Sequence, residues 1–310
     1  MKAIKISVLL GLLFITFTSI FSQDNTFDFP KLSGPYLGQK SPGEIPELFA
    51  KTIMNAEMGY HSSIVFSPDL KEALWRPMDN NGGKILYSKM INKKWAKPEW
   101  INFGIEEKIL DPIFSVDGKR IYFLSFKPDA DGKNQRERIW YVDKTPDGWS
   151  KPKLIDKVVY EHPTHWTFSL AKNGNLYFTS EAAGVRGEQD IYLSRFVNNK
   201  YLPPEDIGPA INSDEREFTP FIAPDESYLI FARFGKSTKT PDLFISFKDT
   251  KGNWSKAISM GEKINSDTND LAPYVSPDGK YFFFVSQREK LNAVMWMKSE
   301  IIYEIKQRLR

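Results

Sequence analysis

The 310-residue sequence contains 42 lysines and arginines against 39 aspartates and glutamates, which gives a net charge of +3. A chain this close to charge balance lacks the concentrated basic surface of a dedicated nucleic-acid-binding protein. Cysteine is absent, which excludes disulfides and a lipid-attachment cysteine from this sequence. Aromatic residues make up 14% of the chain, and their abundance favours a fold rich in β-strands.

Residues 1–22 carry the pattern of a secretory signal peptide. Lys2 and Lys5 form a short basic region, and the stretch from Ile6 to Phe17 is nearly all apolar. Small or apolar residues then offer a cleavage site after Ser22. The alternative is an uncleaved anchor, but the apolar run is shorter than the roughly 20 residues that span a membrane. We therefore expect cleavage near Ser22, no transmembrane segment and a periplasmic or secreted mature protein.

The next segment, residues 23–45, is polar and contains Pro30, Pro35 and several glycines, so we expect a linker or an extended arm. Removing the leader from 310 residues leaves 288 and removes two lysines but no acidic residue, so the net charge falls from +3 to +1. A folded domain at residues 46–310 is large enough to be stable without disulfides or metals.

One pattern recurs five times in this domain: an apolar run, a turn, and a second run rich in aromatic residues. The clearest copy, Leu271 to Ser286, has Ser276-Pro277-Asp278-Gly279 as its turn, which predicts a β-hairpin. The recurring serine or its equivalent is spaced by 48, 54, 54 and 53 residues, at Ser67, Ser115, Ser169, Ala223 and Ser276. A period near 50 with several short strands per repeat indicates a β-propeller or a related β-array.

Each repeat divides into four strands, of which the fourth begins with an aromatic residue and contains proline in most copies, as in Trp149 to Pro152. Because proline is confined to edge strands, the fourth strand is expected at the outer edge of each blade and the first at the inner edge. The fifth repeat lacks its fourth strand and ends in a predicted helix from Ser299 to Leu309, with Ile301, Ile302 and Ile305 on one face.

The segment from Pro46 to Ile53 aligns with the outer-strand region from Pro98 to Ile105. We therefore expect this N-terminal strand to complete the fifth blade and close the ring, which removes exposed sheet edges. The prediction is an all-β fold, a single propeller of five four-stranded blades with a short C-terminal helix. Six blades are the alternative.

The repeats resemble the PD40, or WD40-like, β-propeller repeats of the TolB family. The resemblance rests on Val275 to Lys280 (VSPDGK) and its near copies at Phe114 to Lys119 and Phe66 to Asp69. The third repeat departs from the motif, and the fourth has Glu226 in place of glycine. The resemblance implies an exported propeller, usually a binding scaffold. TolB has a further N-terminal domain and six blades, so a role in the Tol–Pal system is not implied.

The aspartates of the turns have a structural explanation, because an aspartate can accept backbone N–H bonds within a turn. We expect this role for four residues: Asp69, Asp117, Asp225 and Asp278.

Polar side chains gather in the loops before the first strands and after the second strands, which share one face of a propeller around its channel. Alignment places His61, Glu217 and Asp270 at one equivalent position, six residues before the recurring serine. All three histidines fall on this face. The predicted ligand site comprises His61, Arg76, His162, His165, Arg216, Glu217, Arg233, Asp270 and Arg288.

Three kinds of chemistry fit this set. The arginines could pair with a small anionic ligand, and Tyr60 or Trp166 could stack on a sugar ring. A divalent metal would use His61, Glu217 and Asp270, with His162 or His165 as a fourth ligand. The spacing is that of the repeat and not of a metal motif, so we expect no cofactor.

Glu217 and Asp270 are also the candidate catalytic residues, because a glycoside hydrolase uses a pair of carboxylates. The equivalent positions in the second and third repeats, Ile109 and Pro163, supply no third carboxylate. We therefore expect an exported binding module or scaffold of the cell envelope, monomeric, with a protein partner, a glycan or a small anionic ligand at the channel mouth. The alternative is a glycan-active hydrolase.

Overall fold

The computed structural model describes residues 29–54, 58–78, 83–128, 136–181, 184, 186–289 and 291–309, without the side chain of His165. The chain divides into two units, Met1–Pro30 and Lys31–Arg310. The second unit is the folded domain that we describe. The expected signal peptide lies outside the described residues.

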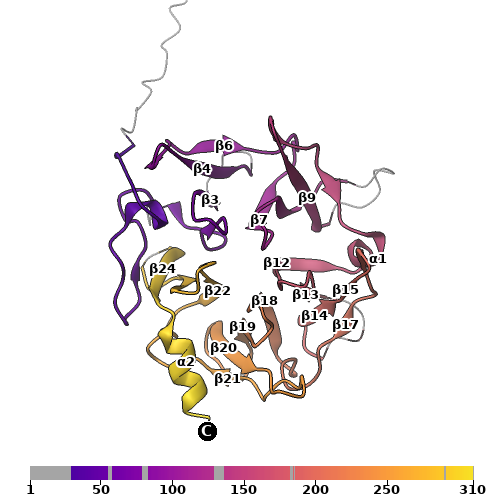
Figure 1. Cartoon of the computed structure of the whole chain (residues 1–310). Coiled ribbons are helices and arrows are strands. Elements are labelled where there is room, and N and C mark those ends of the chain that lie inside the picture. The colour runs from indigo at the N-terminus through magenta and orange to yellow at the C-terminus, as the bar shows by residue number, and fades with distance from the viewer. Residues whose placement is uncertain are drawn as a thin grey trace, which may run out of the picture. The chain divides into compact units, whose positions relative to one another are not determined.

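Five antiparallel sheets form the blades of a propeller in the unit Lys31–Arg310 (Figure 1). From the inner to the outer strand, the first blade consists of β2 (Val65–Phe66), β3 (Glu72–Trp75), β4 (Ile85–Ile91) and β6 (Glu99–Ile101). The second blade consists of β7 (Ile109–Phe114), β8 (Arg120–Ser125), β9 (Arg138–Thr145) and β11 (Lys153–Leu154). The third blade consists of β12 (Thr164–Leu170), β13 (Leu176–Ser180), β14 (Asp190–Ser194) and β17 (Glu205–Asp206). The fourth blade consists of β18 (Arg216–Ile222), β19 (Tyr228–Phe234), β20 (Asp242–Phe247) and β21 (Ile258–Ser259). The fifth blade consists of β22 (Asp270–Val275), β23 (Tyr281–Ser286), β24 (Ala293–Lys298) and β1 (Glu47–Leu48).

The prediction of five four-stranded blades is confirmed, and the alternative of six is not. The helix α2 (Glu300–Gln307) follows β24 and buries the three predicted isoleucines, Ile301, Ile302 and Ile305. The smaller elements are the 3-10 helix η1 (Tyr36–Gly38), the helix α1 (Lys157–Tyr160) and the short strands β5 (Lys94–Trp95), β10 (Gly148–Trp149), β15 (Phe196–Val197) and β16 (Lys200–Tyr201). Within the described ranges, no helix has the length and apolar character needed to cross a membrane.

The predicted closure of the ring is present. Strand β1 pairs with β24, with Glu47 opposite Trp296, and the Phe49 N–H donates to the Val294 carbonyl at 2.9 Å. The Phe49 side chain is buried and makes edge contacts with the rings of Phe283 and Trp296. A segment from the start of the domain therefore completes the last blade, as the alignment with the outer strands indicated.

The residues just before β1 also pack against the blades. Ser33 forms a bridge with Lys94, and the Trp95 indole donates to the Gly34 carbonyl at 2.7 Å. Tyr36 is buried against Phe66 of the first blade and Tyr281 of the fifth. This part of the expected arm therefore covers the junction that β1 closes.

The outer strands begin later than predicted. Trp95 forms a short hairpin between β5 and β4, and the outer strand β6 starts after Pro98. In the third blade, Tyr201 pairs within the ribbon of β15 and β16, and β17 starts after two prolines. Proline has no N–H to donate to a ladder, so strand pairing begins beyond it.

The hydrophobic core lies between neighbouring blades. One cluster joins Leu110, Ile139 and other residues of the second blade to Phe168 and Phe178 of the third. Two further clusters join the first blade to the second and the third to the fourth. Each blade therefore depends on its neighbours for burial of its apolar faces.

The hairpin turns are held by a serine and an aspartate acting together. In the second blade the Ser115 hydroxyl donates to Asp117 at 2.7 Å and accepts from the Arg120 N–H at 3.0 Å. The predicted role of the aspartates is confirmed, because each accepts a backbone N–H from the residue two positions on: Asp69, Asp117, Asp225 and Asp278. The fourth blade keeps this bond although Ala223 replaces the serine.

Four of the inner strands are interrupted by a register shift, between Leu110 and Ile113 in β7 and at corresponding places in β12, β18 and β22. One residue at each bulge has a positive φ: Asp111, Trp166, Thr219 and Ala272. A bulge frees backbone N–H groups from the ladder. Here neighbouring blades accept them: the Thr219 N–H donates to Thr179, and the Ala272 N–H donates to Thr219. These two bonds tie the inner strands of the fourth and fifth blades to the blades that precede them.

Candidate functional site

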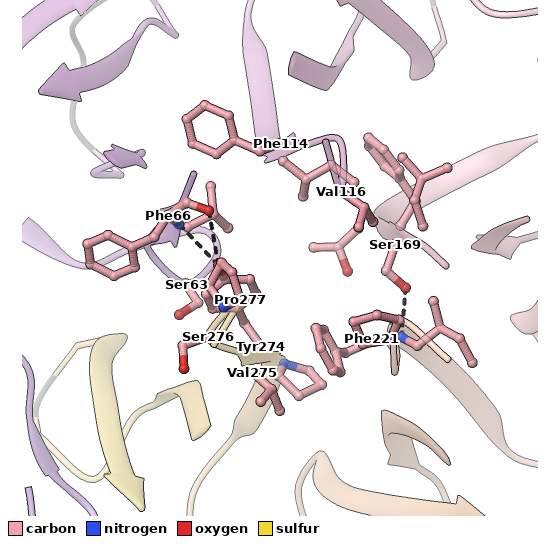
Figure 2. Close-up of a pocket in the computed structure, with 18 of the residues that line it drawn as sticks. Ser63, Phe66, Phe114, Val116, Ser169, Phe221, Tyr274, Val275, Ser276 and Pro277 are labelled. Carbon is pink, nitrogen blue, oxygen red and sulfur yellow. Dashed lines mark hydrogen bonds between the residues drawn. The ribbon is translucent and has the colours of Figure 1, made fainter. Parts of the chain in front are cut away.

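A cavity of about 230 Å³ follows the central channel (Figure 2). It extends from the bulges of the inner strands to the hairpin turns. All five blades contribute to its wall, which is mainly apolar and aromatic and includes Val65, Phe66, Ile113, Phe114, Phe168, Phe221, Tyr274 and Val275. Val116 and Pro277, at the turns, line its far end.

The polar end of the cavity lies at the bulge of the second blade and at the residues just before β2 of the first blade. Asp111 is 2% exposed, and its Oδ1 lies 2.8 Å from His61 Nδ1. Its Oδ2, also buried, has no hydrogen-bond partner within 3.5 Å among the described residues. The buried hydroxyls of Ser62 and Ser63 likewise have none within that distance in the described part of the chain. The Ser62 hydroxyl nevertheless lies close enough to Asp111 to lower its pKa. The clearest unused hydrogen-bonding capacity in this hollow therefore belongs to Asp111 Oδ2 and the Ser63 hydroxyl.

Charged side chains beside this end influence one another's pKa values. The negative charge of Asp111 raises the pKa of His61, against the opposing effect of burial. Burial alone would raise the pKa of Asp111, but the charge and hydrogen bond of His61 outweigh it and hold that pKa below its usual value. Arg76 lowers and Glu137 raises the pKa of His61, so both lie close by. The His61 ring also stacks on Trp166, with centroids 6.1 Å apart.

The candidate catalytic residue Glu217 lies in a closed ion pair. It is fully buried, and Arg233 Nε donates to its Oε1 at 2.7 Å. The Ser213 hydroxyl donates to the same oxygen at 2.6 Å, and the Ser213 N–H donates to Oε2 at 2.9 Å. Burial raises the pKa of Glu217, and these three donors oppose the rise. Both carboxylate oxygens are therefore engaged.

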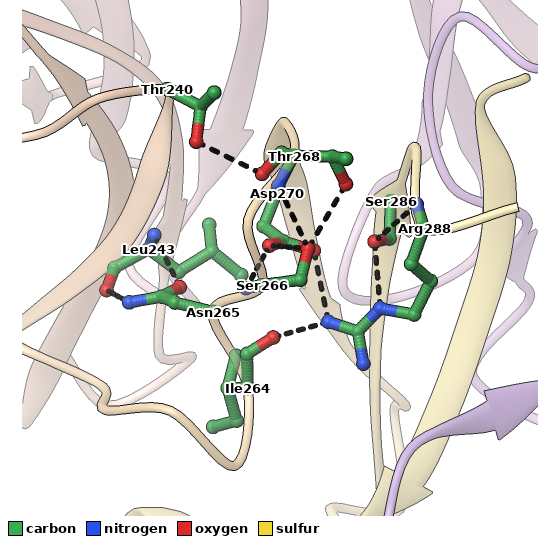
Figure 3. Close-up of polar contacts among 9 residues, drawn as sticks. All are labelled: Thr240, Leu243, Ile264, Asn265, Ser266, Thr268, Asp270, Ser286 and Arg288. Atoms are coloured by element: carbon green, nitrogen blue, oxygen red, sulfur yellow. Dashed lines mark hydrogen bonds and ion pairs between the residues drawn. The ribbon is translucent and has the colours of Figure 1, made fainter. Parts of the chain in front are cut away.

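Asp270 repeats this arrangement in the fifth blade (Figure 3). It is fully buried, and Arg288 donates to its Oδ1 at 3.1 Å. The N–H and hydroxyl of Ser266 donate to its Oδ2 at 2.6 and 2.8 Å. Arg288 also donates to the Ser286 hydroxyl at 2.9 Å. Asp270 occupies the position in the fifth repeat that Glu217 occupies in the fourth.

The two carboxylates hold the segments that connect the blades. Both serines end an Ile-Asn-Ser sequence, at residues 211–213 and 264–266. Asn212 accepts from the Ile191 N–H and donates to the Ile191 carbonyl, both at 2.9 Å. Asn265 makes the same two bonds with Leu243. Each asparagine therefore fastens its connection to the third strand of the preceding blade, while the carboxylate fixes the serine beside it.

The other predicted residues lie in separate surroundings. His162 contacts the Ser180 hydroxyl at 3.0 Å and packs on Tyr192, and burial lowers its pKa, with a smaller effect of Arg136. Arg216 pairs with exposed Glu188. Tyr60, considered as a stacking platform, is 1% exposed.

The structure joins the predicted residues into pairs and not into one cluster. His61 lies beside Arg76, and Glu217 and Asp270 pair with the predicted arginines of their own blades. Nine residues were predicted to form the ligand site, and the side chains of eight of them are described. None of these eight lines the cavity. Across the described parts of the chain, no group of three or more acidic residues and histidines is placed to hold a metal ion.

Asp111 and Ser63 are the cavity residues that the sequence reasoning missed. A signal was present four residues before the recurring serine, where the repeats have Ser63, Asp111, His165, Thr219 and Ala272. This column is small or polar within strands that are otherwise apolar. The charged residues His61, Glu217 and Asp270 stand two positions earlier in their repeats and give the stronger signal.

The sequence matches no described family model and no curated protein. Solved structures do resemble it. TolB from Acinetobacter baumannii matches with a TM-score of 0.51 at 15% identity, over 77% of this chain and 51% of TolB. An endo-arabinase from Bacteroides thetaiotaomicron gives 0.52 at 14%, over 84% of this chain and 97% of the enzyme. A thermostable family-43 glycoside hydrolase gives 0.50 at 14%, over 86% and 91%.

At these identities the likeness shows a shared fold. The resemblance to TolB is thus supported at the level of the β-propeller, and this chain spans about half the length of TolB. Propellers that bind and propellers that hydrolyse glycans both have this fold, so the fold by itself does not decide between them.

Neutralising either buried carboxylate should destabilise the junction between the blades that it connects. We expect Glu217→Gln and Asp270→Asn each to lower the free energy of unfolding by about 2–3 kcal/mol, because each removes a fully buried carboxylate from a partly buried arginine and leaves the serine donors without a charged acceptor. The control is Glu188→Gln, whose side chain is 72% exposed and whose pairing with Arg216 contributes about 1 kcal/mol at most. Urea denaturation measures all three. Unchanged stability in the first two variants would show that these carboxylates are not structural.

The two described histidines should titrate on opposite sides of 6.5. Since the folded pKa of His61 is raised, its pair with Asp111 stabilises the protein fully below the unfolded pKa. That contribution is lost as the pH rises through the folded pKa. NMR titration of the imidazole signals, assigned with His61→Gln, measures both values. A His61 signal titrating below 6.5 would mean that the pair with Asp111 does not form in solution.

Proposed function

We propose that this chain is an exported binding module that holds a small ligand in the central channel of its propeller. The observation that carries the proposal is the cavity itself, which combines apolar walls with buried polar groups that lack partners. Ligand sites are typically hollows of this kind, mostly apolar with a few convergent polar groups. The proposed site therefore lies within the channel, whereas the sequence suggested the loop face at its mouth.

The energetics of the polar end favour a bound molecule. A buried donor or acceptor without a partner costs about 1–3 kcal/mol. Asp111 Oδ2 and the Ser63 hydroxyl are two such groups within one cavity. A ligand that pairs with them removes this cost, while its apolar part covers the aromatic walls.

The predicted anionic ligand has less support from the geometry. Arg233 and Arg288 are neutralised by Glu217 and Asp270, and neither arginine lines the cavity. Arg76 lies beside His61, which is itself paired with Asp111. A partner protein bound on the loop face is compatible with this site, because the loop-face residues predicted from the sequence do not line the cavity.

The alternative, a glycan-active hydrolase, is favoured by the fold likeness to the endo-arabinase and the family-43 enzyme. Glycoside hydrolysis requires two carboxyl groups that face the substrate about 5–10 Å apart. Among the described lining residues, Asp111 is the single carboxylate. Release of reducing ends from arabinan, abolished by Glu217→Gln in a variant of unchanged stability, would favour the enzyme.

The proposal also includes export of the chain from the cytoplasm and a relation of its repeats to the PD40 family. The basic residues Lys2 and Lys5 and the apolar run from Ile6 to Phe17 support export. The Ser-x-Asp turns support a relation to PD40 repeats. N-terminal sequencing of the chain recovered from the periplasm or medium of a bacterial host should begin at Gln23. Intact chain retained in the cytoplasm would argue against export.

A bulky residue at the turn end should close the channel. We expect 4-ethylphenol, a probe of suitable size with an apolar body and one hydroxyl group, to raise the melting temperature by a few degrees at about 100 times its dissociation constant. Val116→Trp should reduce this shift, because Val116 lines the cavity and is 39% exposed at the turns.

The matched control is Val197→Trp. Val197 is 46% exposed on the short strand β15 and does not line the cavity. Its replacement should leave the shift unchanged. An equal loss in both variants, or no shift with the native chain, would contradict binding in the channel.

A further inference from the structure

We propose that Asp111 and Ser63 select an uncharged ligand that carries a hydroxyl group on a compact apolar or aromatic body. This inference rests on the proposed channel site and specifies the chemistry that the site accepts. It is carried by the two polar groups themselves. Both are more than nine-tenths buried, both line the cavity, and each has an oxygen without a hydrogen-bond partner among the described residues.

The free oxygen of Asp111 requires a donor. An ionised carboxylate only accepts hydrogen bonds. Asp111 is ionised here, because His61 binds its other oxygen and lowers its pKa despite complete burial. A ligand group that meets Oδ2 must therefore carry an O–H or N–H.

The hydroxyl of Ser63 distinguishes among donors. It occupies the same repeat position in the first blade as Asp111 in the second, and it can donate as well as accept. A ligand hydroxyl that donates to Asp111 offers its own oxygen to Ser63, so both protein groups are satisfied at once. An ammonium group has no acceptor to offer and leaves the serine proton unused.

The local charges argue against a cationic ligand. Asp111 already pairs with His61, and the charge of Arg76 also lowers the pKa of Asp111. Because these neighbours already offset the charge of the carboxylate, an incoming cation would gain little attraction against its loss of hydration. A neutral hydroxyl enters this end of the cavity at a smaller desolvation cost.

The cavity also sets the size and orientation of the ligand. An apolar cavity of about 150 Å³ holds benzene. At about 230 Å³, this cavity suits a molecule of roughly ten non-hydrogen atoms by the same scale. The hydroxyl belongs at the bulges, and the apolar body extends toward the turns between Phe114, Phe221 and Tyr274, which come from three blades (Figure 2).

Three probes with equal numbers of non-hydrogen atoms test the inference by calorimetry on the whole chain. They are 4-ethylphenol, which has a hydroxyl, its isomer 4-methylanisole, which can only accept, and protonated 4-methylbenzylamine, which is a cation. We expect 4-ethylphenol to bind about tenfold or more tightly than 4-methylanisole, since a hydrogen bond to a charged group is lost with the ether. The cation should bind more weakly than the phenol.

Asp111→Asn should abolish this preference, because the amide places a donor where the unpaired oxygen stood. Asparagine tolerates the positive φ of 48° found at this position, so the strand can keep its bulge. The two isomers should then bind within about twofold of each other. The matched control is Ser115→Ala, which removes a hydroxyl at the opposite end of the cavity and should keep the preference. The fourth blade shows that alanine is accepted there, at Ala223.

Each outcome decides a different point. Equal binding of the two isomers to the native chain would overturn the hydroxyl selectivity and leave the channel site standing. Tightest binding of the cation would overturn the argument from charge balance. Absence of binding by all three would overturn the channel site together with this inference. A preference that persists in a folded Asp111→Asn variant would show that Asp111 does not confer it.

Discussion

The bulge in the inner strands is the feature on which both the ring and its cavity depend. A regular strand would pair every inward N–H with its own hairpin partner. The left-handed residues at Asp111, Thr219 and Ala272 release N–H groups instead, and those of Thr219 and Ala272 bond to threonines of the preceding blades. Farther along the channel, the Ile222 N–H donates to Ser169 and the Phe66 N–H donates to Tyr274. Cross-blade hydrogen bonds therefore join the third, fourth, fifth and first blades in turn along the channel wall.

Asp111 shows how this constraint produces a site. Its own bulge directs its carboxylate toward the cavity, where His61 of the first blade satisfies one oxygen and leaves the other. Glu217 and Asp270, the carboxylates that stood out in the sequence, differ from Asp111. Arginine and serine donors bind both oxygens of each of them, so neither has an oxygen left for a ligand. The charged side chains at the loop face thus stabilise the connections between blades. The polar groups with unused hydrogen-bonding capacity lie deeper in the channel.

Most of the architecture could be predicted from the sequence, because a propeller repeats its local signals. The recurring turns gave the number of blades, and the match between Pro46–Ile53 and Pro98–Ile105 gave the closing strand. The start of the outer strands was wrong by a few residues, since the aromatic residues before the prolines form separate hairpins. The site was harder to predict. His61 was identified, but its partner Asp111 and the cavity depend on bulges that a period-two strand pattern conceals.

Binding in the channel can be observed in a crystal of the chain soaked with 4-ethylphenol. We expect the ring between the inner strands and its oxygen about 2.5–2.8 Å from Asp111 Oδ2, the length of a hydrogen bond to a carboxylate. His61 should keep its contact with the other oxygen. Electron density for the ligand on the loop face beside the arginines, with the channel filled only by water, would contradict a channel site. It would return the search for function to the face that the sequence first suggested.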